Sequence, residues 1–199
     1  MSGAAEAASL RAGFGDPVRD AQATFRLVLE AMARPGRVQE IAATLDPPPG
    51  VHPASAAILL TLLDHETPVW IELASGRDEA ARFFAFHCGC PLAEAPEEAR
   101  FVLVDALPQA MERFPAGSAE RPELSATLIL QLKALDGGTP VALSGPGIEE
   151  RARIAPRGLP AAFWDMTRDN HALFPSGVDF ILVAGRAICG LPRTTRAEA

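Results

Sequence analysis

The pattern of apolar residues is clearest near the C-terminus, where two short apolar segments follow one another. Residues 178–184 and 187–191 are rich in Val, Ile and Leu and show little polar alternation. That pattern is typical of strands covered on both faces. Gly185-Arg186 separates the segments, and Gly at the first central position of a two-residue loop suits a type II′ turn. The sequence therefore predicts a buried β-hairpin.

Upstream, apolar residues recur at intervals of three and four. A first helix is expected to begin at Asp16-Pro17 and to end at Pro35-Gly36, because Asp is a good N-cap and Pro-Gly interrupts a helix. One of its faces carries Val18, Ala21, Phe25, Val28 and Met32, which recur at intervals of three and four. The other expected elements are helices at 53–65, 77–87, 108–114 and 159–170 and strands at 69–73, 101–104, 126–132 and 140–144.

These elements predict one α/β domain. Helices and strands alternate first, and later strands then pair locally; Gly137-Gly138 predicts a second hairpin, between 126–132 and 140–144. The order favours a three-layer α/β/α domain with a mixed sheet, spanning residues 16–199. Residues 1–15 are rich in alanine and are expected to form a loose N-terminal arm.

Composition narrows the class of protein. A net charge of −7 argues against nucleic acid as a partner. The longest apolar run, residues 54–63, is too short and broken for a bilayer, so we expect no membrane contact. The N-terminus lacks the apolar stretch of a signal peptide, and three cysteines make no disulfide framework. These features favour a cytoplasmic protein.

The hairpin is followed by a basic segment that is the main candidate for ligand contact. Arg193, Thr194, Thr195 and Arg196 are suited to a triphosphate, because guanidinium groups match phosphate oxygens and hydroxyls add donors. The alternative is a solvated tail or a contact with another subunit. Asp179 begins the hairpin and is expected to form an ion pair with Arg193.

A second candidate is the glycine-rich turn Ser144-Gly145-Pro146-Gly147. Gly145 and Gly147 allow backbone N–H groups to approach a phosphate. Pro146 has no N–H to offer, and an ordinary turn at the end of a strand explains the same residues. The sequence therefore leaves both interpretations open.

Other candidates are weaker, and the sequence assigns no catalytic residue. Lys133 is the only lysine, so it alone can form the Schiff base that pyridoxal phosphate needs; its place before a turn favours a solvated side chain. The segment 87–90, HCGC, holds three soft ligands but lacks a second pair with zinc spacing, so no metal is expected. Asp64-His65-Glu66 suits acid–base work or a charged helix end.

Five segments, taken together, resemble the PhnH subunit family of the bacterial carbon–phosphorus lyase system, which degrades phosphonates. Their order and spacing carry the resemblance, which extends from Asp16 to the C-terminus. The segments are DAQATFRLVLEAMARPG (20–36), LLTLLDHETPVW (59–70), RFFAFHCGCPL (82–92), ATLILQLKAL with GGTPVALSGPGIEE (126–150) and FPSGVDFILVAGRAICGLPRTT (174–195).

The resemblance implies a fold similar to that of the pyridoxal-phosphate-dependent transferases, without the cofactor. It implies a homodimer when isolated and a hetero-oligomer with PhnG, PhnI and PhnJ. With PhnG, PhnI and PhnL, such a subunit is required to join an alkylphosphonate to the ribose of ATP, displacing adenine and giving a ribose 1-alkylphosphonate 5-triphosphate. Two alternatives stay open: a stand-alone homodimeric binding module for a phosphorylated ligand, and a pyridoxal-phosphate-type transferase.

Overall fold

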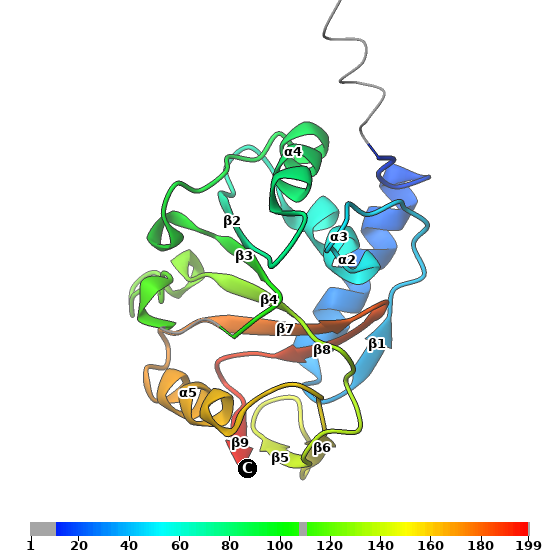
Figure 1. Ribbon diagram of the computed structural model, residues 1–199. Coiled ribbons are helices and arrows are strands. Elements are labelled where there is room, and N and C mark those ends of the chain that lie inside the picture. The colour runs from blue at the N-terminus through cyan, green and yellow to red at the C-terminus, as the bar shows by residue number, and fades with distance from the viewer. Residues whose placement is uncertain (1–10, 108–110, 199) are drawn as a thin grey trace, which may run out of the picture.

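A six-stranded mixed sheet forms the centre of the molecule (Figure 1). The computed structural model describes residues 11–107 and 111–198. The strand order is β1-β8-β7-β4-β3-β2. Strands β2, β3, β4 and β7 run parallel, whereas β8 is antiparallel to both β7 and β1. The bounds are β1 Val38–Glu40, β2 Val69–Glu72, β3 Phe101–Val104, β4 Thr127–Gln131, β7 Asp179–Ala184 and β8 Ala187–Leu191.

The predicted C-terminal hairpin is confirmed as β7 and β8. Ala184 pairs with Ala187, and Gly185 in the turn has a φ of +60°. Successive β7 residues face opposite sides of the sheet: Ile181 packs in one core and Leu182 in the other. Because both sides are covered, the strand needs no polar positions, which explains the missing alternation.

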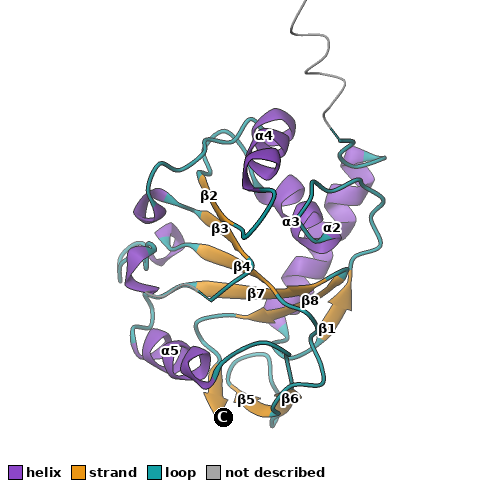
Figure 2. Cartoon of the chain, in the orientation of Figure 1, coloured by secondary structure: helices purple, strands orange, loops and turns teal. Residues whose placement is uncertain are grey.

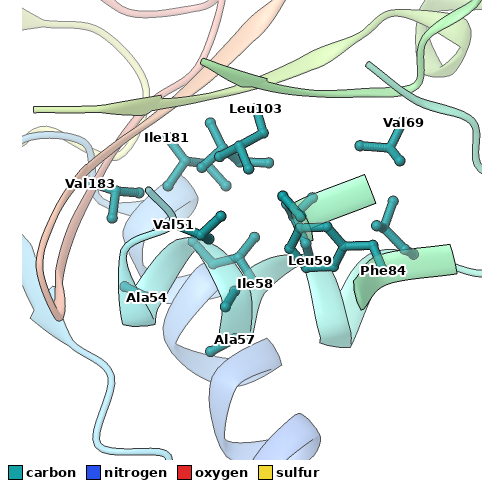
Figure 3. Packing of buried hydrophobic residues seen from close by; sticks show 14 of the residues in the cluster. Val51, Ala54, Ala57, Ile58, Leu59, Val69, Phe84, Leu103, Ile181 and Val183 are labelled. Atoms are coloured by element: carbon teal, nitrogen blue, oxygen red, sulfur yellow. The ribbon is translucent and has the colours of Figure 1, made fainter. Parts of the chain in front are cut away.

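Three helices cover one face of the sheet (Figure 2). They are α2 (Pro17–Ala33), α3 (Pro53–Leu62) and α4 (Arg77–Cys88). α3 is apolar nearly all round, and Ile58 and Leu59 are completely buried between the sheet and the other helices. Figure 3 shows these side chains meeting Leu103 and Ile181 of the sheet and Phe84 of α4. This apolar layer holds the helices to the sheet.

One helix and a small sheet cover the opposite face. The helix is α5 (Ala161–Ala172), and the three-stranded sheet has the order β6-β5-β9. Its strands are β5 Val141–Ser144, β6 Ala152–Ile154 and β9 Arg196–Glu198. Phe163 of α5 packs edge-on against Phe180, with 5.3 Å between ring centroids. The domain is thus a layered α/β structure in which the second outer layer is only partly helical.

The predicted second hairpin is wrong. β4 lies inside the central sheet between β3 and β7, and β5 belongs to the small sheet. β4 already has a strand on each side, so it has no edge left for β5. Gly137, with a φ of +70°, turns the chain away, and Gly138 N–H donates to Ala155 O over 2.8 Å. The glycines mark a loop between two sheets.

The first helix forms as predicted, and the residues of its predicted apolar face divide between the core and the solvent. The buried residues of α2 are Thr24, Val28 and Ala31. Val18 is 80% exposed, Phe25 45% and Leu29 52%. At about 100° per residue, these three side chains lie within roughly 40° of one another on the outside of the helix. We call Val18, Phe25 and Leu29 the α2 apolar stripe.

Two predicted segments lie partly outside the described residues. Residues 1–10 of the predicted arm are not described, whereas 11–15 contact the domain: Arg11 pairs with Asp46 over 2.6 Å, and Gly15 N–H donates to Thr44 O over 3.3 Å. For the predicted helix at 108–114, residues 108–110 lie outside the description and Met111–Arg113 form a 3-10 turn. In the described part of the chain, no helix combines the length and apolar character needed to cross a bilayer.

α2 approaches β8 at Gly190, and the lack of a side chain there is required. A Cβ atom at Gly190 would lie 2.3 Å from Ala31 O and 2.6 Å from Ala31 C. Both are backbone atoms of α2, so the helix would have to move away from the sheet. Gly185, by contrast, has nothing within 4 Å of such a Cβ.

We predict that Gly190→Ala destabilises the domain more than Gly185→Ala does. Gly185→Ala should cost about 1–2 kcal/mol, the price of a left-handed conformation for a residue with a side chain. Gly190→Ala should reach or exceed about 3 kcal/mol, the upper end for overpacked cores. Urea unfolding followed by circular dichroism measures both. Equal losses for the two variants would contradict the backbone contact between α2 and β8.

Candidate functional site

A partly buried ion pair lies at the base of the basic C-terminal segment. Arg193 Nη2 donates to Asp179 Oδ2 over 2.6 Å, and Arg193 Nε donates to Asp179 Oδ1 over 3.1 Å. The two side chains are only 12% and 19% exposed. This is the ion pair that the sequence predicted. Such a fork-to-carboxylate contact is strong and geometrically specific.

The rest of the Arg193 guanidinium is also engaged inside the chain. Nη1 donates to Pro122 O over 3.1 Å and to Pro175 O over 3.3 Å, and Nη2 donates to Ser125 Oγ. All the N–H directions are thus taken up by the protein. In this arrangement, Arg193 and Asp179 hold residues 122–125 and 174–175 to the end of β8.

Of the remaining predicted contact residues, Gly145, Thr194 and Arg196 line a cleft, whereas Thr195 is buried. β5 pairs with β9, with Ser144 opposite Arg196, so the glycine-rich turn lies beside the basic segment. A cleft of about 320 Å³ opens there, lined by Ser144, Gly145, Pro146, His171, Phe174, Thr194 and Arg196. Thr195 is 3% exposed and does not line it. Two motifs that the sequence treated separately thus form one site, which we call the Arg196 cleft.

His171, near the end of α5, fixes the Arg196 side chain. His171 Nδ1 lies 2.9 Å from Arg193 O. A carbonyl oxygen only accepts, so Nδ1 carries the proton. The unprotonated Nε2 then accepts from Arg196 Nε over 2.9 Å. Within residues 11–107 and 111–198, the Nη1 and Nη2 groups of Arg196 have no hydrogen-bond partner, which leaves the outer fork of the guanidinium open.

The two glycines of the turn are required by packing. Gly145 has a φ of +131°, and a Cβ there would lie 2.8 Å from Thr194 O. Gly147 has a φ of +82°, and a Cβ there would lie 2.0 Å from Ala33 O at the end of α2. Ile148 N–H donates to Gly145 O over 3.1 Å, as in a tight turn. The turn interpretation of the sequence is confirmed, and the turn lies against the cleft.

A second cavity, of about 450 Å³, lies between α5 and residues 111–116. Apolar side chains line most of it, among them Met111, Phe114, Met166 and Leu173, and Glu112 and Asp169 supply carboxylates. Two carboxylates repel an anion. Of these two hollows, only the Arg196 cleft has the charge that a phosphorylated ligand requires.

The carboxyl edge of the parallel strands is filled by the chain itself. Ligands often bind at this edge in α/β sheets. Here Gln131 Oε1 accepts from His52 N over 2.6 Å, and Gln131 Nε2 donates to Gly50 O over 2.8 Å. His52 Nδ1 accepts from Gly185 N over 3.2 Å, and burial lowers the pKa of His52. This network holds the start of α3 to β4 and to the hairpin turn.

The weaker candidates of the sequence analysis lie in places that a structural role explains. Lys133 is exposed after β4, as expected for a solvated side chain. His87 Nε2 lies 3.0 Å from Arg11 O, and Cys90 is buried. Among the described residues, no group of three His, Cys, Asp or Glu side chains is placed to hold a metal ion. Asp64 accepts from Glu66 N and from Thr67 Oγ1, and these bonds lower its pKa, as in a helix-end turn.

His171 and Phe174 are the cleft residues that sequence reasoning missed. His171 lies on an amphipathic helix and reaches Arg196 only because β9 returns beside α5. Phe174 is 60% exposed at the cleft. In the sequence it stood out only as part of a segment that carries the family resemblance. The available signal was that this aromatic residue stands before the apolar segments of the predicted hairpin and not within them.

Fold and cleft together define a mixed-sheet α/β protein that has an arginine-lined cleft beside its small sheet. The family model for the bacterial phosphonate metabolism protein PhnH matches residues 12–198. The alpha-D-ribose 1-methylphosphonate 5-triphosphate synthase subunit PhnH of Rhizobium meliloti (strain 1021) is 40% identical over 187 residues, 93% of this chain and 94% of that protein. The putative C-P lyase subunit protein HtxG of Stutzerimonas stutzeri is 34% identical over 177 residues, 87% and 84% of the two chains. The chain belongs to the PhnH family, which confirms the resemblance.

We predict that breaking the Arg193–Asp179 pair is costly and that removing both partners is less so. Arg193→Met or Asp179→Leu alone should cost about 2–3 kcal/mol, because each leaves a mostly enclosed charge without its partner. The double variant should lose clearly less than the sum. As a control, Arg168→Met removes an exposed pair with Asp165, 59% and 65% exposed, and should cost under about 1 kcal/mol. Denaturant unfolding measures all four; additive losses would contradict the coupling.

We also predict that the thiols react slowly in the folded protein. Burial raises the pKa of Cys88 to about 12 and that of Cys189 to about 11, so very little thiolate is present at pH 8. Iodoacetamide labelling followed by mass spectrometry should modify both residues slowly in buffer and rapidly in urea. Rapid labelling of the native protein would instead identify a reactive cysteine.

Proposed function

We propose that this chain is a subunit of a carbon–phosphorus lyase assembly that forms ribose 1-alkylphosphonate 5-triphosphate from ATP and an alkylphosphonate, releasing adenine. The observation that carries the proposal is the 40% identity to a synthase subunit over 94% of that protein's length. A match of this extent covers the whole described fold, including the hairpin, the small sheet and the cleft. The reaction belongs to the transferase class.

The polar groups of the chain support a subunit that acts with others. Arg193, Asp179 and Gln131 are engaged in internal contacts, and the buried cysteines have raised pKa values. The outer fork of the Arg196 guanidinium, by contrast, has no partner within the described residues and faces the cleft that it lines. Such a site can bind and orient a charged group. Both ring nitrogens of His171 are engaged, so the histidine beside the Ser144 and Thr194 hydroxyls has no free nitrogen to act as a base.

The proposal extends to the fold type, the cofactor, the cellular location and the partners of the chain. We infer a sheet arrangement similar to that of the pyridoxal-phosphate-dependent transferases, without the cofactor, a cytoplasmic location and a homodimer for the isolated chain. The exposed position of Lys133 argues against the alternative of a pyridoxal-phosphate enzyme, because a Schiff-base lysine needs an enclosed site. We infer PhnG, PhnI and PhnJ as physical partners and PhnL as a functional one.

The α2 apolar stripe is the surface that we assign to contact with another subunit. Three large apolar side chains, Val18, Phe25 and Leu29, stand exposed in one line along a helix. Apolar patches on soluble proteins commonly mark such interfaces. Charged neighbours on the same helix, Arg19 and Arg26, are exposed as well, which gives the polar rim that protein–protein contacts usually have. Because both relatives are named as subunits, the occupant that fits this stripe is a sister subunit.

We predict that Phe25→Asp/Leu29→Asp abolishes assembly without unfolding the chain. Two carboxylates in an apolar interface lose hydration that nothing replaces, so binding should weaken by about a hundredfold or more. The tagged chain is co-expressed with PhnG, PhnI and PhnJ and recovered by affinity purification. Ala23→Asp adds a charge to an exposed position on another side of the same helix and should leave recovery unchanged.

The same experiment decides the proposed function. The purified assembly with PhnL should release adenine from ATP in the presence of methylphosphonate, and the isolated chain should not. A wild-type chain that never co-purifies with the other subunits, or that converts the substrates alone, refutes the subunit assignment. Undiminished recovery of the double variant refutes only the assignment of the α2 apolar stripe.

A further inference from the structure

We propose that the Arg196 cleft binds a phosphoryl or phosphonyl group carried on a small organic molecule, with Arg196 as the charged contact and His171 as the residue that positions it. The inference rests on the proposed function only for the biological identity of the ligand. The charge, the donors and the size of the cleft determine which chemical group it can bind.

Charge is the first argument. Arg196 lines the cleft, and none of the seven lining residues is acidic. Glu198, two residues further along β9, pairs with Arg151 over 3.0 Å instead. The cleft is therefore locally positive in a protein of net charge −7. Tetrahedral oxyanions are the groups that a guanidinium fork binds best, through two parallel N–H donors.

Preorganisation is the second argument. The contact between Arg196 Nε and His171 Nε2, 2.9 Å, uses the inner N–H of the guanidinium and leaves the outer fork open. His171 is itself held by Arg193 O at 2.9 Å, and Arg193 is fixed by Asp179. A side chain that is already ordered loses less entropy when a ligand binds. The chain Asp179–Arg193–His171–Arg196 thus aims an exposed guanidinium by means of buried contacts.

Neutral donors are the third argument. Ser144 and Thr194 line the cleft, and the hydroxyl of each can donate a hydrogen bond to a phosphoryl oxygen. Gly145 also lines the cleft, and within the described ranges its N–H group donates to no backbone carbonyl outside the helices and strands. A free backbone amide adds partial positive charge beside an anion. Pro146 contributes shape only, because it has no N–H.

Size and an apolar rim indicate the rest of the ligand. The cleft, at about 320 Å³, lies in the size range of small-molecule sites and has room for more than an inorganic ion. Phe174 is 60% exposed at the same cleft. Its ring offers a flat apolar face to a sugar or an alkyl group attached to the anion. A phosphorylated pentose is a ligand of this kind.

The test uses the full-length chain and ribose 5-phosphate, inorganic phosphate, methylphosphonate and ribose as probes, with affinity measured by calorimetric titration. The three anions should bind and ribose should not. Arg196→Gln should weaken the binding of each anion by about tenfold or more, the effect of losing a charged hydrogen-bond donor. Phe174→Ala should weaken ribose 5-phosphate but not inorganic phosphate.

Two variants of His171 distinguish a role in positioning Arg196 from a purely structural role. His171→Phe removes the acceptor for Arg196 Nε and should weaken anion binding several-fold, whereas His171→Gln keeps an acceptor and should restore most of the affinity. Arg153→Gln serves as the matched control, because Arg153 is an exposed arginine of the same small sheet that does not line the cleft. Melting temperatures of all variants verify that they are folded.

Three results overturn the proposal: no saturable binding of any anion to the wild-type chain, Arg196→Gln binding as tightly as wild type, or Arg153→Gln losing as much as Arg196→Gln. Equal losses in His171→Phe and His171→Gln overturn the positioning role. None of these results depends on the other subunits, so they are distinguishable from a failure of the chain to join the assembly.

Discussion

The buried contact between Arg193 and Asp179 determines how the last part of the chain is arranged. Asp179 begins β7, and Arg193 follows β8, so the ion pair closes the hairpin at its open end. The same guanidinium holds Pro122 O and Pro175 O. With Arg193 fixed, the turn from Pro192 to Thr195 brings β9 beside β5. The small sheet, and with it the cleft, follows from this one satisfied arginine.

Much of the fold could be predicted from local patterns, because local patterns determine local structure. The hairpin of β7 and β8 was predictable from two apolar runs and Gly185, and α3 from a helix that is apolar all round. The pairing of β5 with β9 brings together residues 142–144 and 196–198, and nothing local in either segment encodes it. β4 was misassigned to a hairpin because glycines after a strand fit a hairpin and a longer loop equally well.

At the candidate site, too, the residue type could be read from the sequence, whereas the burial and the contacts of each residue could not. The sequence grouped Arg193 and Arg196 as candidate ligand contacts in one basic tail, although it paired Arg193 with Asp179. In the structure, one is buried against a carboxylate and the other stands exposed at a cleft. Gly145 and Gly147 looked like an anion cradle or a turn. Their Cβ positions meet Thr194 O and Ala33 O, so packing alone accounts for them, whether or not a ligand binds nearby.

The cleft and the α2 apolar stripe are mechanically linked. The turn containing Gly147 lies against the last residues of α2: a Cβ at Gly147 would be 2.0 Å from Ala33 O and 3.1 Å from Pro35. α2 in turn lies on β8 at Gly190, again backbone to backbone. Contacts of this kind leave no side chain to reorient, so the helix, the hairpin and the turn have to move together or not at all. A subunit seated on the outside of α2 would therefore contact a helix that packs, backbone to backbone, against both the hairpin and the turn beside the cleft.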